Sequence, residues 1–182
     1  WLIKADFGQY LPNWRPTKDY RSTYSSHVAE GGGIVLEAVH EFDYLHWLGG
    51  AIRDVAGYAS KLSDLEIDGE DTAGLALRFQ SGLVAEIHLD YLRYEKARGC
   101  EVLGSEGIVS WRSHGDPPER VEVKYFDKNI RVWRDLVQID EWDGNEMYLA
   151  ETAHFFQCVE SGQTPVLDAA GGRNVLNMRR WS

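Results

Sequence analysis

The chain has 182 residues, of which 43% are hydrophobic and 26% are charged, and its formal net charge is −10. A chain of this length builds one domain with a substantial core. The acidic balance argues against a nucleic-acid partner, because phosphate binding needs clustered Lys and Arg. No apolar run approaches the roughly 20 residues that cross a bilayer. We therefore expect a globular domain that binds neither nucleic acid nor membrane.

The cysteines and the chain ends bear on the context of this domain. Cys100 and Cys158 lie far apart and form no C-x-x-C motif. This usage predicts two reduced thiols in a cytoplasmic protein and leaves a single disulfide between them open. The chain begins at Trp1, inside a strand pattern, and stops at Ser182, directly after a helical one. We therefore expect a piece of a longer polypeptide.

The N-terminal part begins with a strand pattern at residues 1–7 and continues with residues 8–32, which show no hydrophobic periodicity. Gly, Pro, Asn, Ser and Thr are frequent in this second segment, so it predicts a long ordered loop or lid. The glycine triplet Gly31-Gly32-Gly33 leads into a helix predicted over residues 34–48, which two further glycines end. The triplet has two interpretations. Its N–H groups bind an anion, or it forms a tight turn that lets the helix begin close to a strand or ligand.

The predicted helix is apolar almost all round, yet it carries His40 between two carboxylates. Glu37 and Asp43 lie three residues before and after the histidine, each about 60° away around a continuous helix. Unpaired charges in an apolar setting cost roughly several kcal/mol, so such a cluster calls for an explanation. A histidine held between acids after a flexible turn predicts a proton-handling site, and a satisfied core histidine is the alternative.

A series of short strands follows, because apolar and polar residues alternate with period two between turn residues. After the turn at residues 80–82, the odd-numbered positions to 91 are apolar, whereas Glu86, His88 and Asp90 share the other face. This pattern is typical of a half-buried antiparallel hairpin. The predicted strands cover residues 52–62, 73–79, 83–91, 99–103, 108–111, 121–125 and 136–139.

Two helices are predicted to close the chain. Residues 145–161 carry an apolar stripe and end at Gly162, and Asp168 caps a second helix that runs through Leu176 and Met178. Consecutive antiparallel strands with helices segregated to the ends indicate an α+β fold. We expect a predominantly antiparallel, open-faced sheet with helices packed on one face.

Several common functional motifs are absent from the sequence. It contains no Gly-x-Gly-x-x-Gly after a strand, no Walker A motif, no serine nucleophile elbow and no H-E-x-x-H zinc motif. Within the predicted helix, His46 lies about 120° around from His40, which is poor for joint metal ligation. The triad of Glu86, His88 and Asp90 is typical of a solvated or interface-lining face, with cation binding as the weaker alternative. We therefore predict no metal site.

Three parts of the sequence resemble the Gfo/Idh/MocA family of oxidoreductases. The glycine triplet, the step Leu36-Glu37 and the run from His40 to Leu48 look like the second domain of these enzymes. Residues 8–16, which contain a Trp-Arg-Pro loop, and residues 19–21 are similar to one branch of the family. The ending resembles the family's closing helices at Glu151, Phe155, Val159, Gly162, Pro165, Asp168 and Gly171.

The resemblance implies the architecture of the complete protein. Family members join an N-terminal Rossmann domain to an α+β domain with a large open-faced sheet. Residues 1–182 are thus expected to be a single C-terminal domain for substrate binding and oligomerisation, without the Rossmann domain. Pairing of sheet faces into a homodimer or homotetramer is implied too.

The resemblance also implies the reaction and its cofactor. The expected activity is an NAD(P)-dependent oxidation or reduction of a sugar, inositol or sugar-derived alcohol. NAD or NADP would be bound mainly by the absent domain. Gly32 and Gly33 are the candidate cofactor contacts of this chain.

The role of His40 follows from the same resemblance, because a histidine on this helix lies beside the nicotinamide and the reacting hydroxyl in the family. His40 is therefore the expected acid/base, and Glu37 and Asp43 would raise its pKa and orient its ring. Leu36 stands where many members carry an Asp, with Glu37 as the nearest replacement. The family's catalytic lysine has no counterpart, because Lys96 follows the helix in a predicted strand connection.

The loop ahead of the helix supplies the candidate substrate residues. Arg15 is expected to reach a carboxylate, a phosphate or the cofactor edge with its two-pronged guanidinium, or to stack on Trp14 or Tyr20. Asp19 and Tyr20 are expected to contact the ligand or to hold the loop.

Two other function classes fit parts of the sequence. A non-catalytic ligand-binding or sheet-mediated dimerisation module would keep His40 sealed in the core and would expose an apolar sheet face. A metal-dependent lyase or hydrolase would use His40 or His88 as a ligand. Metal analysis of the purified protein distinguishes the second class.

Overall fold

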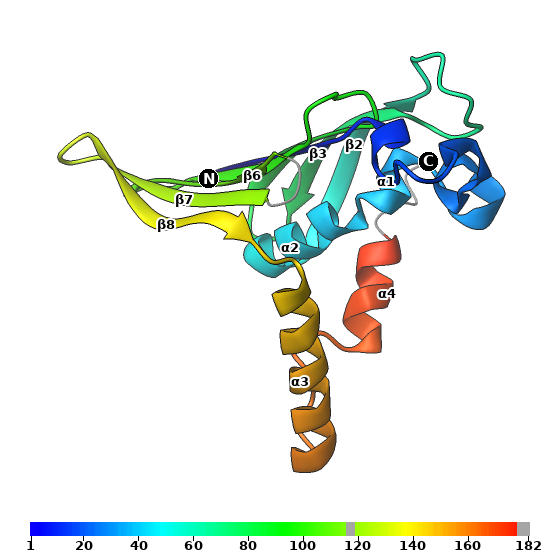
Figure 1. The fold of residues 1–182 in the computed structure, drawn as a ribbon. Coiled ribbons are helices and arrows are strands. Elements are labelled where there is room, and N and C mark those ends of the chain that lie inside the picture. Colours follow the sequence, from blue (N-terminus) through cyan, green and yellow to red (C-terminus); the bar gives the residue numbers. More distant parts are fainter. Residues whose placement is uncertain (116–118, 178–182) are drawn as a thin grey trace.

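The computed structural model describes residues 1–115 and 119–177, and it shows one eight-stranded mixed sheet (Figure 1). The strands lie in the order β2-β3-β4-β1-β5-β6-β7-β8, and each neighbouring pair is antiparallel except β1 and β4. Their bounds are β1 (Leu2–Gly8), β2 (Ile52–Ser60), β3 (Thr72–Phe79), β4 (Val84–Asp90), β5 (Ala97–Leu103), β6 (Gly107–His114), β7 (Glu119–Asp127) and β8 (Val132–Trp142). The predicted α+β class and the mainly antiparallel sheet are confirmed.

The parallel pair is the part of the topology that the sequence pattern does not predict. β1 comes first in the chain but lies inside the sheet, where Ala5 is opposite Ile87 of β4 and Cys100 of β5. A parallel pair needs a long crossover connection. Residues 9–83 supply it, and they contain the loop, two helices and strands β2 and β3.

Two helices, α1 (Ile34–Glu37) and α2 (Val39–Gly49), lie on one side of the sheet (Figure 1). α1 contacts β3 and β4, and α2 contacts β1. The core contains buried apolar residues from both layers, among them Ile3, Ala5, Ile34, Phe42, Leu45, Leu75, Leu77, Phe79, Ile87 and Leu89. On the other side of the same strands, Arg78, Glu86 and His88 are exposed, so alternation has sorted the two faces as predicted.

The predicted loop between β1 and α1 is irregular but ordered. It contains four short 3-10 helices: η1 (Leu11–Asn13), η2 (Tyr20–Ser22), η3 (Tyr24–Ser26) and η4 (Val28–Glu30). Trp14 anchors the loop, because its ring packs edge-on against Phe7 and Tyr91, with centroids 5.9 and 5.3 Å away. The indole N–H of Trp14 also donates to the backbone oxygen of Gln9 at 3.1 Å.

The helix predicted after the glycine triplet is divided at Ala38, whose φ of −91° and ψ of 26° are not helical. α1 is fixed at its start by Glu70. The backbone oxygen of Glu70 accepts a hydrogen bond from Ile34 N at 3.0 Å, and its Oε1 accepts one from Val35 N at 3.1 Å. α2 is anchored elsewhere, through Phe42 in the core. Alanine is the best helix former, so nothing in the local sequence predicts this division.

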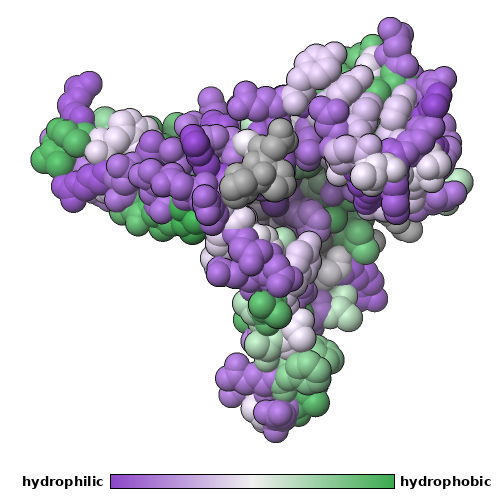
Figure 2. Space-filling model, viewed as in Figure 1, coloured by the Kyte–Doolittle hydropathy of each residue, from purple (hydrophilic) through white to green (hydrophobic). Residues whose placement is uncertain are grey.

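The C-terminal helices α3 (Asn145–Ser161) and α4 (Ala169–Asn177) follow β8, and the last predicted helical residue, Met178, lies outside the described residues. α3 extends away from the sheet instead of covering it (Figure 1). Its helical periodicity is confirmed, but its apolar side chains are exposed, as the green surface at the lower end of Figure 2 shows. The exposed apolar residues of α3 are Met147, Tyr148, Leu149, Phe155, Phe156 and Val159. None of the helices in the described ranges has both the length and the hydropathy of a membrane span.

Both cysteines are free thiols and both are buried. Cys100 lies on β5 within the core, and burial raises its pKa to about 11. Cys158 lies on α3. The thiolate is the reactive form of cysteine, so the buried Cys100 is not suited to act as a nucleophile.

Substitution of Leu77 tests the assignment of the sheet faces. Leu77 is 1% exposed, and Leu77→Ala leaves a cavity, so we expect the free energy of unfolding to fall by about 2–5 kcal/mol. The matched variant Arg78→Ala lies on the other face and should change it by less than about 0.5 kcal/mol. Urea denaturation followed by Trp fluorescence measures both, and equal losses would contradict the assignment.

Candidate active site

The glycine triplet forms a tight turn against the chain's own backbone. Gly31 and Gly33 have φ of 93° and 101°, which favour glycine. A Cβ added to Gly32 would lie 2.4 Å from the backbone oxygen of Tyr24, and one added to Gly33 would lie 2.6 Å from Oε1 of Glu70. The close approach that the glycines permit is therefore to their own loop and to the β2–β3 connection.

The N–H groups at the start of α1 are already engaged. Each N–H of residues 32–35 donates to an oxygen of this chain. The acceptors are His27 O, Ser25 O, Glu70 O and Glu70 Oε1, at 2.9, 3.2, 3.0 and 3.1 Å. These hydrogen bonds favour the tight-turn interpretation over an anion site. The role of Gly32 and Gly33 in cofactor binding stays a prediction that this geometry does not support.

His40 is exposed on α2, and no hydrogen bond or ion pair among the described residues joins it to Glu37 or Asp43. Glu37 lies on α1 and accepts hydrogen bonds from Ser25 Oγ at 2.5 Å and Tyr24 Oη at 3.2 Å. Because Ala38 divides the helix, the regular spacing assumed for a continuous helix does not hold between Glu37 and His40. The expected bracket of two acids around the imidazole is not formed in the described structure.

The acid that the sequence analysis missed is Glu41, the residue after His40. Glu41 is 1% exposed, and its Oε1 accepts a hydrogen bond from Nε of Arg98 at 2.6 Å. Its second oxygen, Oε2, is buried and has no hydrogen-bond partner among the described residues. Burial raises the pKa of Glu41, and the Arg98 guanidinium opposes this effect only in part. The pair joins α2 to β5.

Arg15 stacks on an aromatic ring, but not on either predicted one. Its guanidinium carbon lies 5.4 Å from the ring centroid of Tyr24. Of the two predicted stacking partners, Trp14 packs its ring against Phe7 in the core. The hydroxyl of Tyr20 accepts a hydrogen bond from Glu66 N at 3.1 Å. Contact of Arg15 with a substrate stays a prediction.

Asp19 braces the loop through Arg21. Its Oδ1 accepts a hydrogen bond from Arg21 N at 3.0 Å, and Oδ2 lies 2.8 Å from Nη2 of the same residue. Hydrogen bonds from Arg21 lower the pKa of the Asp19 carboxyl. Arg21 also reaches Glu66, with 2.7 Å between Nη1 and Oε2. Asp19 and Tyr20 therefore tie the loop to the segment after β2, which agrees with the loop-holding alternative.

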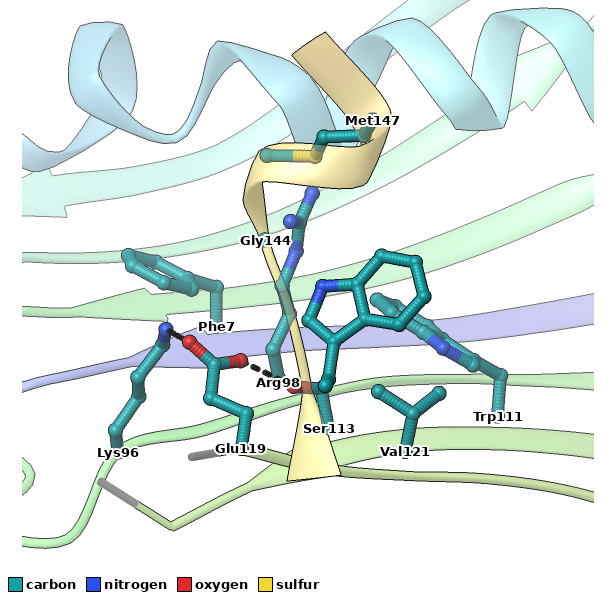
Figure 3. A pocket seen from close by; sticks show the side chains of 10 residues that line it. Phe7, Lys96, Arg98, Trp111, Ser113, Glu119, Val121, Gly144 and Met147 are labelled. Carbon is teal, nitrogen blue, oxygen red and sulfur yellow. Dashed lines mark hydrogen bonds and ion pairs between the residues drawn. The ribbon is translucent and has the colours of Figure 1, made fainter. Parts of the chain in front are cut away.

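A cavity of about 480 Å³ opens between strands β5–β8 and the start of α3. Its walls include Phe7, Lys96, Arg98, Trp111, Ser113 and Glu119 (Figure 3). Glu119 forms an ion pair with Lys96 and accepts a hydrogen bond from Ser113 Oγ at 2.6 Å. Burial opposes ionisation of Glu119, but the hydrogen bonds from Lys96 and Ser113 outweigh it and lower the pKa of this carboxyl. The cavity thus combines a fixed polar network with aromatic walls.

His88 and Asp90, two of the residues considered for metal binding, are engaged with each other and with the backbone. Nε2 of His88 lies 2.9 Å from Oδ2 of Asp90, and Oδ1 of Asp90 accepts hydrogen bonds from Leu92 N and Arg93 N. Within the ranges 1–115 and 119–177, no group of three or more His, Cys, Asp or Glu side chains is arranged to hold a metal ion. The geometry gives the metal-dependent alternative no support.

Comparison with known proteins identifies the family. Residues 1–110 match the GFO/IDH/MocA C-terminal domain. The chain belongs to the GFO/IDH/MocA family. This confirms the resemblance seen in the glycine triplet and the histidine helix.

Among curated proteins, this GFO/IDH/MocA domain is 25% identical over 160 residues to scyllo-inositol 2-dehydrogenase (NAD(+)) of Bacillus subtilis (strain 168). Among solved structures, it is similar to levoglucosan dehydrogenase in complex with NADH, with a TM-score of 0.74 and 17% identity over 96% of this chain. It is also similar to the WlbA dehydrogenase from Bordetella pertussis in complex with NADH and UDP-GlcNAcA, with a TM-score of 0.64 and 22% identity over 98% of this chain. At these identities the structures show a shared fold.

The matches also place this domain within longer proteins. The alignment with the inositol dehydrogenase covers 83% of this chain but 44% of that relative. The two structures are covered over 53% and 49% of their chains. The chain therefore spans about half the length of the relatives that it matches.

The Glu41–Arg98 pair predicts a pH-dependent loss of stability when the cation is removed. In Arg98→Leu the buried carboxylate loses its counter-charge, which costs about 3–5 kcal/mol. The pKa of Glu41 is already raised in the folded state, so protonation relieves this penalty. The variant's loss of unfolding free energy should be complete at about pH 8. It should shrink as the pH falls toward 4.5, the ordinary pKa of Glu.

Denaturation of wild type and variant across this pH range measures the effect. The control is Arg53→Leu, which removes an exposed partner of Asp54 and should cost less than about 1 kcal/mol. If Arg98→Leu lowered the free energy of unfolding equally at both ends of the pH range, the charge of Glu41 would not be the cause of the destabilisation.

Proposed function

We propose that this chain is the C-terminal, substrate-binding domain of an NAD(P)-dependent oxidoreductase that acts on a sugar, inositol or sugar-derived alcohol. Family membership and the likeness to an NAD-dependent inositol dehydrogenase support the reaction class. The observation in this chain that carries the proposal is the exposed imidazole of His40 on α2. Among residues 1–115 and 119–177 His40 has no hydrogen-bond or ion-pair partner, so its exposed imidazole is available to a substrate.

In this proposal His40 takes the proton of the substrate hydroxyl when the alcohol is oxidised and returns it in the reverse direction. Histidine suits this step because its charge changes near neutral pH. Asp43, half-buried one turn further along α2, is proposed to orient the imidazole when the site is complete. Glu37 is held by Ser25 and Tyr24, so we assign it to fixing the loop against α1.

The proposed cofactor is bound outside this chain. A nicotinamide dinucleotide supplies hydride-transfer chemistry when bound. The N–H groups of residues 32–35 are all engaged within the chain, so the start of α1 does not offer its phosphate site. We therefore propose that a Rossmann domain in the complete polypeptide binds NAD or NADP and that this chain supplies the substrate side.

Self-association through the open sheet face is also part of the proposal. This face carries exposed charged residues such as Arg78 and Glu86. Pairing into a homodimer or homotetramer would then depend on complementary charges and would weaken with salt.

Substitution of His40 tests the proposed proton transfer. In the complete product of the gene that encodes this chain, His40→Asn should lower kcat for NAD(P)-dependent polyol oxidation by about 10²–10⁴. The matched control is His46→Asn, on the same helix, because His46 Nδ1 lies 2.8 Å from Gly50 O and serves the helix end. Turnover near the wild-type value in His40→Asn would refute the assignment.

Dinucleotide binding by the separate chain gives a second test. Residues 1–182 alone should show no heat of binding with NAD or NADP in calorimetry, because the expected phosphate contacts lie elsewhere. The complete gene product serves as the positive control. Micromolar affinity of the separate chain for NAD or NADP would contradict the proposal that another domain binds the cofactor.

A further inference from the structure

The charged side chains at the cavity beside β5–β8 differ in how many of their hydrogen-bond donors are used. Lys96 forms an ion pair with Glu119, and Ser113 adds a hydrogen bond to the same carboxylate. Arg98 uses only its Nε, which donates to Glu41 at 2.6 Å. No described residue accepts a hydrogen bond from Nη1 or Nη2 of Arg98. The cavity wall therefore includes a guanidinium with unused donors.

Two contacts hold this guanidinium in place. Glu41 accepts a hydrogen bond from its Nε, and the Arg98 guanidinium carbon lies 5.5 Å from the ring centroid of Trp111. Tyr44 supports Trp111 in turn, with ring centroids 6.1 Å apart. Figure 3 shows Arg98 between the Lys96–Glu119 pair and Trp111. A guanidinium fixed by a carboxylate and an aromatic face loses little freedom when it binds a ligand.

We propose that this cavity binds the carboxylate group of a polyhydroxylated acid, such as a sugar acid, through Nη1 and Nη2 of Arg98. The inference rests on the proposed function and names its substrate class. The planar fork of Arg matches the two oxygens of a carboxylate. Lys96, Glu119 and Ser113 offer partners for hydroxyl groups, and Trp111 offers a flat surface for the carbon skeleton. The volume of about 480 Å³ is within the range of about 300–1,000 Å³ for small-molecule sites.

The charges at the cavity favour a carboxylate over a phosphate. Glu119 already neutralises Lys96, and Glu41 is 1% exposed, behind the guanidinium. In the part of the chain that the structure describes, each cation of the cavity wall therefore has one carboxylate partner, and Arg98 is the cation that offers two unused guanidinium nitrogens side by side. A phosphate carries up to two negative charges, so a phosphorylated polyol would need a second such cation.

The link to the proposed proton acceptor is the Glu41–Arg98 pair itself. Glu41 follows His40 on α2, and Arg98 lies on β5 and lines the cavity. The ion pair therefore fixes the helix of the histidine and the carboxylate-binding group relative to each other. A polyol acid held by Arg98 would be positioned relative to that helix.

The test uses the complete gene product and measures binding separately from turnover. Calorimetry is performed with D-gluconate and D-galacturonate, with myo-inositol and D-galactose as neutral probes and with galactose 6-phosphate as the phosphorylated probe. We expect the two acids to bind more tightly than the other probes. Arg98→Gln should raise Kd for the acids about 10–100-fold and leave the neutral probes unchanged.

Two further variants keep the test decisive. Arg98→Gln leaves Glu41 buried without a counter-charge, so the double variant Glu41→Gln/Arg98→Gln removes both charges and should show the same loss of acid binding in a folded protein. Arg112→Gln is the matched control. Arg112 lies on β6 next to Trp111, but it faces the other side of the sheet and pairs with Asp6 at 2.9 Å. This variant should bind the acids as the wild type does.

The outcomes separate the two proposals. If the acids bind no better than the neutral polyols, or if the double variant binds them as well as wild type does, the carboxylate site is wrong, whether or not a neutral polyol is oxidised. Tighter binding of the phosphorylated probe would also overturn it. If acid binding depends on Arg98 but no polyol is oxidised with NAD or NADP, the site is supported and the proposed function fails.

Discussion

The buried ion pair between Glu41 and Arg98 is the contact on which the arrangement of the candidate site depends. Apolar packing of α2 on the sheet is non-directional, so by itself it allows the helix several positions of similar free energy. A carboxylate that is 1% exposed and bound at 2.6 Å restricts these positions strongly. Withdrawing two charges from water costs several kcal/mol, roughly, so the pair contributes position rather than net stability. We interpret it as a register lock between the helix of His40 and strand β5.

The regular parts of the fold could be predicted because their signals are local. The alternation of Ala85, Ile87 and Leu89 with exposed neighbours assigns both the strand and its buried face without knowledge of any partner. The helical stripe of α3 is equally local, but its burial is not. Whether Phe156 and Val159 are covered depends on what surrounds the helix, and within the described residues nothing covers them. Periodicity therefore predicts the element and leaves its environment undetermined.

The candidate site was harder to predict because its contacts are not local. The placement of Glu37 beside His40 assumed one continuous helix. The helix is instead divided at Ala38, and α1 is held at its start by Glu70, which is distant in the sequence. Glu41 could not be recognised as an ion-pair partner, because Arg98 follows 57 residues later. A sequence motif can indicate that a histidine helix is present. It cannot show which of the neighbouring acids points inward.

The position of β1 within the sheet has a consequence for the folding of this domain during its synthesis. Within residues 1–182, β1 precedes both of its neighbours, β4 and β5, which follow only after residue 83. Until then, the backbone groups of Leu2–Gly8 have no ladder to join, and Ile3 and Ala5 have no core to enter. Pairings this distant in sequence slow folding and prolong the exposure of unpaired strands. During that interval, the apolar side chains of β1 stay exposed to water and to wrong partners.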